Sequence, residues 1–143
     1  MSKRSKIAIL AVYGMLMLWL LFGQRMGQGS QGILQLEPLH TLKQFWWVLR
    51  NSSQPGLRTH AWINLAGNVA MFVPLGFLMP WIWSFWRKFG WHFLLMVAVI
   101  ILVELAQYFL GLGTCDVDDL LLNLVGTSLG FLFEKMVRQL SRS

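Results

Sequence analysis

Four long apolar runs, separated by polar stretches, dominate the pattern of this chain. They cover residues 7–22, 61–86, 91–112 and 120–133. A helix rises about 1.5 Å per residue, so the third run is about 33 Å long, close to the thickness of about 30 Å of a bilayer's hydrocarbon core. The pattern predicts an all-α polytopic membrane protein with four transmembrane helices, in which residues 1–143 form a single domain.

The first run also resembles a secretory signal peptide, because three basic residues precede it. However, residues 23–27, which follow it, offer no small-x-small cleavage site, and Tyr13 and Trp19 are bulky for a signal core. We therefore expect an uncleaved first transmembrane helix.

The polar stretch after the first run divides into two parts. Residues 24–35 are rich in Gly and Gln and predict a loop. Residues 39–50 instead carry apolar side chains at helical spacing, together with the tryptophan pair Trp46 and Trp47. This segment is too short to span a bilayer, so we expect an interfacial or re-entrant helix in the first outer loop.

Basic residues indicate the orientation. Eight of the twelve Lys and Arg lie at the N-terminus, in the second loop or in a charged C-terminal tail that begins at Glu134, and none lies in the third loop. By the positive-inside rule, both termini then face the cytoplasm, and the first and third loops face outward.

Seven polar side chains lie in or beside the second, third and fourth runs. A carboxylate at the bilayer centre costs roughly 2.5–3.5 kcal/mol, so ionisable residues there face a partner or a polar cavity. With this orientation the seven come from three helices to one level in the outer half of the membrane. With Asp116 added, the candidate ligand-binding residues are Asn64, Asn68, Glu104, Gln107, Asp116, Asp118, Asp119 and Asn123.

Small residues accompany the polar ones. Asp119 and Asn123 share one stripe of the fourth helix with Gly126 and Gly130, and this glycine pair permits close packing on another helix. Pro74 should bend the second helix and open the cavity. The fourth run is only about 21 Å long, so either its helix continues to residue 137 or the carboxylates lie below the headgroups.

Each polar residue also has a structural explanation. The amides could form interhelical hydrogen bonds, worth about 0.6 kcal/mol each in membranes. Asp116, Asp118 and Asp119 could simply cap the fourth helix, with Asp118 or Asp119 satisfying its free N–H groups. Oxygen ligands also suit a divalent cation such as Mg²⁺ or Ca²⁺, but the Asp-x-Asp-Asp spacing alone is insufficient to assign a metal site, and we expect no cofactor.

Composition narrows the class of protein. Charged residues make up 13% of the chain, against about 25% in soluble domains. The net charge of +6 does not indicate a nucleic-acid surface, because the basic residues lie at the ends of apolar runs. Cys115, the single cysteine, has no histidine nearby in sequence to act as a base, so we expect it to be inert.

Two stretches resemble the VanZ-like family of small bacterial membrane proteins. The first covers residues 64–78 and includes Pro74 and Gly76, which we expect to have structural roles. The second combines Glu104-x-x-Gln107 with residues 116–130. Both are spaced as the family spaces them, and they cover roughly the second half of the chain.

The resemblance implies a multi-pass protein of the bacterial inner membrane. The family's founding member is associated with resistance to teicoplanin, a lipid-tailed glycopeptide that binds cell-wall precursors. The family pattern usually has an arginine shortly before the aspartates, where this chain has Gly113 or Thr114. If that arginine holds an anionic group, this protein must hold it differently or not at all.

We expect a protein that binds an envelope lipid, an amphiphile or a lipid-linked cell-wall precursor in an outward-facing polar cavity, and contributes to glycopeptide resistance. The alternative is a membrane enzyme that acts on a lipid-linked phosphate or sugar through the acidic cluster. A third interpretation is a structural partner of another membrane protein, bound through the glycine stripe.

Overall fold

The structure, a computed structural model, describes residues 1–23, 33–112 and 114–141. Four of its helices are long and apolar enough to cross a bilayer, which confirms the predicted class. These are α1 (Lys3–Leu18), extended by a π-helical turn over Trp19–Gly23, α3 (Pro55–Ile82), α4 (Phe89–Phe109) and α5 (Val117–Leu140). The shorter elements are α2 (His40–Asn51), a 3-10 turn over Ser84–Arg87, and strands β1 (Ile33–Gln35) and β2 (Thr114–Asp116).

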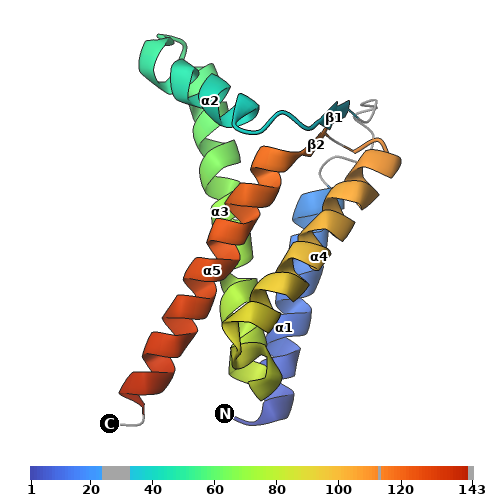
Figure 1. The fold of residues 1–143 in the computed structure, drawn as a ribbon, viewed down its shortest axis with the longest axis vertical. Coiled ribbons are helices and arrows are strands. Elements are labelled where there is room, and N and C mark those ends of the chain that lie inside the picture. The colour runs from blue at the N-terminus through green and yellow to red at the C-terminus, as the bar shows by residue number, and fades with distance from the viewer. Residues whose placement is uncertain (24–32, 113, 142–143) are drawn as a thin grey trace.

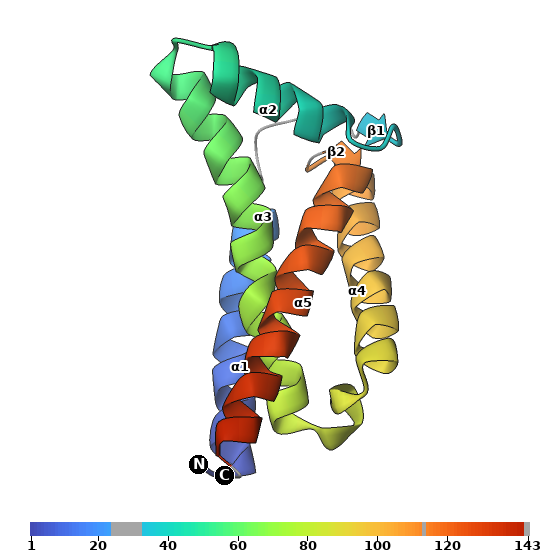
Figure 2. The same cartoon turned by 60° about the vertical axis from the view of Figure 1, so that its left-hand side comes forward.

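The four long helices form a bundle with two different ends. Both termini lie at one end, here called the termini end, and α2 lies with both strands at the other, the α2 end (Figure 1). Figure 2 shows α2 lying across the bundle rather than along it. An even number of spans places both ends of a chain on the same side of a membrane, as seen here.

Several predicted boundaries change. The second helix begins at Pro55 rather than at Ala61, and the fourth runs from Val117 to Leu140. The predicted charged tail therefore belongs to a helix over most of its length, and of the two alternatives for the short fourth run, the longer helix is the one observed. Within the predicted loop, residues 24–32 lie outside the described residues, and residues 33–35 form β1 instead.

The strands were missed because each is only three residues long. Ile33–Gln35 pairs in parallel with Thr114–Asp116, so the first and third loops are joined by main-chain hydrogen bonds. Strands are recognised in a sequence by alternating apolar and polar residues, and three residues are too few to show this alternation. The two strands are also about 80 residues apart, so neither indicates its partner.

Polar side chains satisfy the carbonyl groups at the end of α3. The last carbonyls of a helix have no partner within it. Here the Lys6 ammonium donates to the Trp81 carbonyl at 3.3 Å, and Arg87 Nε donates to the Pro80 carbonyl at 3.1 Å. The start of α1 is thereby fixed beside the end of α3, and Lys6 also lies 4.1 Å from the centre of the Trp81 ring.

Helix α4 ends in a glycine motif that leads to the acidic segment. Gly111 has a φ of 65°, a left-handed conformation that glycine adopts without steric cost. The Leu112 N–H donates to the Gln107 carbonyl at 2.8 Å, as in a Schellman motif. The chain thus reverses within a few residues and brings Asp116 to the start of α5.

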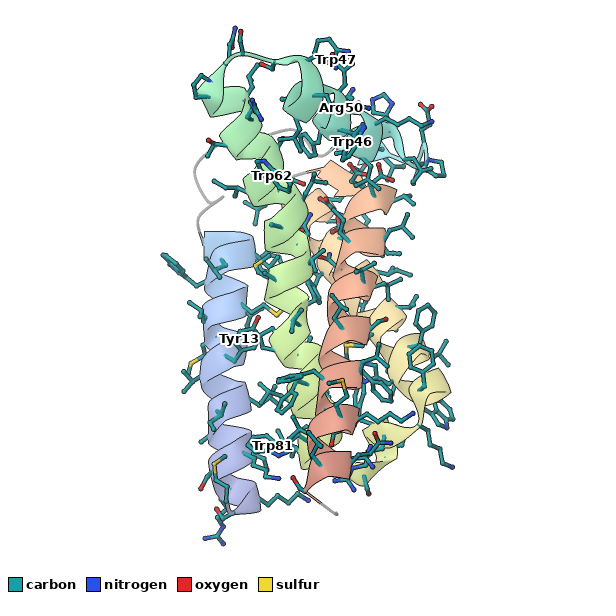
Figure 3. The ribbon with its side chains drawn as sticks, turned by 90° about the vertical axis from the view of Figure 1, so that its left-hand side faces the viewer. Tyr13, Trp46, Trp47, Arg50, Trp62 and Trp81 are labelled. Carbon is teal, nitrogen blue, oxygen red and sulfur yellow. The ribbon has the colours of Figure 1, made fainter. Side chains whose placement is uncertain are left out.

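The core lies where α1, α3 and α4 meet. Its buried members are Met17, Leu21, Phe72 and Ile100, and leucines of α5 pack against them. Across the α1–α3 contact, the Tyr13 hydroxyl donates a hydrogen bond to the Met71 carbonyl, three residues before Pro74. Figure 3 shows Tyr13 between the tryptophans Trp46 and Trp47 at the α2 end and Trp81 at the other, and nearer to Trp81.

Helices α3 and α5 make the closest contact of the bundle through glycines. A Cβ added to Gly126 would lie 2.2 Å from the Val69 carbonyl oxygen, and one added to Gly130 would lie 2.0 Å from that of Val73. From the other side, a Cβ on Gly76 would lie 2.1 Å from the Thr127 carbonyl oxygen. The backbones therefore touch, as the Gly-x-x-x-Gly spacing predicts.

Replacing Gly130 with Ala should separate these helices. The new methyl group meets backbone that cannot move aside, so we expect a loss of about 1–3 kcal/mol and a fall in Tm of several degrees. Thermal unfolding of the purified variant in detergent measures this. The matched control is Gly67→Ala in α3, where a Cβ meets open space. Equal Tm values for the two variants would contradict the contact.

Candidate functional site

Two aspartates at the start of α5 hold the start of α2. Asp118 is fully buried, and its two carboxylate oxygens accept hydrogen bonds from the backbone N–H groups of Leu39, at 2.6 Å, and Leu42, at 3.0 Å. The side chain of Leu39, the residue at the N-cap position of α2, makes no capping bond. Asp118 thus supplies from another helix the cap that α2 lacks in its own sequence.

Asp116 caps the start of α5 in the same way. Its Oδ1 accepts the Asp118 N–H at 2.8 Å, and its Oδ2 accepts the Thr41 hydroxyl at 2.5 Å. The N-cap of α5 is therefore Asp116, one of the three aspartates predicted as candidate caps, and Asp118, which was expected to satisfy the free N–H groups, bonds to α2 instead. Asp116 precedes the helix in extended conformation, the conformation that N-cap residues require.

Asp119 faces α3 and contacts one of the predicted amides. Asn68 Nδ2 donates to Asp119 Oδ1 at 2.5 Å. These two residues are separated in sequence by the second half of α3 and all of α4, so they meet only through the fold. The contact joins the polar residues of the second and fourth spans at one level, toward the α2 end.

The polar residues of α4 are also buried. Glu104 is 5% exposed and Gln107 is 3% exposed. Gln107 Nε2 donates to the Leu21 carbonyl at 2.9 Å, in the π-helical turn that follows α1. Gln107 thereby satisfies a backbone acceptor at the end of the first span. This hydrogen bond was not predicted from the sequence.

The pKa of the Cys115 thiol depends on the charges around it. Burial raises the pKa of its thiol above the ordinary value, and the negative charges of Glu104 and Asp116 raise it further. Glu104 thus acts on Cys115, and its side chain is buried. A raised pKa leaves Cys115 protonated and weakly nucleophilic near neutral pH.

Two amide oxygens in this region have no hydrogen-bond partner among the residues that the structure describes. They are Oδ1 of Asn123, which is 3% exposed, and Oδ1 of Asn64. Asn123 lies one turn below Asp119 on α5, and Asn64 lies one turn from Asn68 on α3. Leaving a buried acceptor unsatisfied costs about 1–3 kcal/mol, so each oxygen is a position where a donor would be stabilised.

The termini end contains a buried acidic group. Glu134, predicted to begin a charged tail, is 2% exposed, and both its oxygens accept from Arg138 Nε, at 3.1 and 3.3 Å. His92, also buried, packs on Phe131 with ring centres 4.8 Å apart. The i,i+4 spacing of Glu134 and Arg138 was a signal for this pair.

No metal centre is assigned in the described part of the chain. Over residues 1–23, 33–112 and 114–141, no three His, Cys, Asp or Glu side chains are grouped so as to hold an ion. The carboxylate oxygens of the aspartates instead accept hydrogen bonds from N–H and O–H groups of the protein.

A comparison with known protein families identifies the chain. The VanZ/LLP1 family model matches residues 7–138. The chain belongs to the VanZ/LLP1 family. The match covers all four candidate spans almost completely, so it extends beyond the two stretches on which the resemblance rested. Searches of curated proteins and of solved structures each found no match.

Replacing Asp118 with Ala should release α2 without unfolding the bundle. Two backbone N–H groups lose their acceptor, at a cost of about 1–3 kcal/mol confined to the first turn of α2. Hydrogen exchange followed by mass spectrometry should show faster exchange in residues 39–45 and unchanged exchange in α3 and α5. Glu37→Ala, which removes an exposed acid beside α2, is the control. Equal acceleration throughout the chain would refute a local cap.

The alkylation of Cys115 should depend on pH in a defined way. Because the pKa of the thiol is raised, the rate of reaction with a maleimide should rise at a higher pH in the folded protein than in protein denatured with dodecyl sulfate. In the Glu104→Gln variant this pH should fall, since one of the neighbouring negative charges is lost; in Glu37→Gln it should not change. A folded thiol that ionises below the denatured one would contradict the arrangement.

Proposed function

We propose that this VanZ/LLP1 protein binds an envelope lipid or related amphiphile at the α2 end, between α3, α4 and α5. The observation that carries the proposal is Asn123 Oδ1, a buried acceptor without a partner in the described residues, one turn from the bonded pair of Asp119 and Asn68. A residue that served only to join helices would have its amide oxygen satisfied, since nothing else offsets its burial.

The chemistry of the available atoms indicates the kind of headgroup. The unsatisfied oxygens of Asn64 and Asn123 accept hydrogen bonds, and carboxylates such as Glu104 only accept them. A headgroup that presents hydroxyl, amine or amide N–H groups suits this lining. A bare phosphate does not, because it would bring negative charge to carboxylates. Sugar and peptide headgroups of cell-wall precursors and of glycopeptides are of the favoured kind.

Helix α2 supports access from one leaflet. Trp46 and Trp47 are about three-fifths exposed on it, and Arg50 lies 5.8 Å from the centre of the Trp46 ring. Exposed tryptophans beside a cation are typical of a membrane–water interface. We propose that α2 lies at the outer surface of the bacterial inner membrane, that both termini are cytoplasmic, and that an amphiphile enters beside it. Sequestering a lipid-tailed glycopeptide there would contribute to resistance.

Replacing Asn123 with Leu distinguishes binding from helix adhesion. Leucine has the same branched shape, although it is larger, and it removes an unsatisfied acceptor, so Tm should stay the same or rise, by the equivalent of about 1 kcal/mol. The amount of co-purified amphiphile, measured by lipid mass spectrometry, should fall about tenfold, the factor that corresponds to about 1.4 kcal/mol.

The matched control is Thr127→Val, a buried polar residue on the same helix whose hydroxyl bonds within the helix, to the Leu124 carbonyl. It should leave the co-purified amphiphile unchanged. An Asn123→Leu protein that keeps its lipid and melts at a lower temperature would make Asn123 a structural residue and refute the proposal. Turnover of a lipid-linked substrate by the wild type would replace binding by catalysis.

A further inference from the structure

A cavity of about 420 Å³ lies at the termini end, away from all the residues considered above as candidate site. Its walls come from the first turn of α1, the last turns of α3 and the 3-10 turn over Ser84–Arg87 that follows. Figure 1 shows that these segments lie at the opposite end of the bundle from α2.

The polar residues that line this cavity can all donate hydrogen bonds. Lys3 carries an ammonium group, Ser84 a hydroxyl, and Trp83 and Trp86 indole N–H groups. None of the described residues that line it carries a carboxylate. The acid on this part of the described structure, Glu134, is buried and already paired with Arg138. The cavity is therefore complementary to an anion.

Lys3 is available for such an anion, whereas two of its basic neighbours are not. Lys6 and Arg87 donate to the last carbonyls of α3. Lys3 precedes Lys6 by one helical turn, on the same face of α1, and within residues 1–23, 33–112 and 114–141 its ammonium makes no hydrogen bond or ion pair. Its charge is thus left for something outside the chain.

Apolar side chains complete the cavity. Met79 and Ile82 of α3 are also part of its lining. A cavity lined by a cation, by residues that can donate hydrogen bonds and by apolar side chains matches a phospholipid, whose phosphate accepts hydrogen bonds and whose acyl chains are apolar. We propose that this cavity binds the phosphate of an anionic phospholipid, in the leaflet that meets the termini end. The proposal is independent of the amphiphile site at the α2 end.

Native mass spectrometry of the full-length protein in an uncharged detergent tests this site. In such a detergent no charged leaflet attracts the basic residues in general, so only a specific site favours anionic lipid. Wild-type protein should bind phosphatidylglycerol more tightly than phosphatidylcholine. Lys3→Gln should weaken phosphatidylglycerol binding about tenfold, as loss of one charge-assisted hydrogen bond predicts, and Lys3→Arg should restore it.

The matched control is Lys135→Gln, which removes an exposed cation from the same end without touching the cavity. It should change binding by less than about twofold. Equal losses in the two Gln variants would show a diffuse charge effect and overturn the site, as would a Lys3→Gln protein that binds like the wild type. Displacement of phosphatidylglycerol by millimolar inorganic phosphate would show that the site takes free phosphate and not lipid.

Discussion

The need to provide donors for buried carboxylates governs the α2 end of this protein. Asp116, Asp118 and Asp119 lie within four positions, and their partners belong to three elements: backbone N–H groups of α2 and α5, the Thr41 hydroxyl and the Asn68 amide. A carboxylate buried without such partners would take up a proton, or the segment that carries it would not pack in this position. The acidic segment thus fixes the position of α2, the start of α5 and the half of α3 nearer the α2 end together.

This arrangement works only because α3 and α5 approach closely below it. With side chains in place of Gly76, Gly126 and Gly130, the helix axes would separate and the bond between Asn68 and Asp119 would lengthen. The hydrophobic effect does not drive these two helices together in a membrane, since lipid tails are as apolar as leucine. Backbone contact supplies the attraction and the polar pair above it supplies the register.

The sequence predicted those parts of the site that depend on helical spacing. The stripe of Gly126 and Gly130 and the common level of Asn68 and Asp119 follow from a period of 3.6 residues and from the span order. The partners of Asp118 could not be predicted in this way, because they are backbone N–H groups of Leu39 and Leu42, and every residue except proline has one. The burial of Glu134 was not predicted, because an acid near a chain end is usually solvated, whereas here α5 continues past it.

The pairing of Ile33–Gln35 with Thr114–Asp116 has a consequence for biogenesis. Segment 33–42 leaves the ribosome long before residues 114–118 exist, so α2 spends that interval without its partner strand and without its cap. Only after synthesis of the fourth span begins can the first loop take up its final place. The last part of the chain to be made thus completes an element encoded in its first third, and a truncation before residue 114 should leave the earlier helices inserted and this surface unassembled.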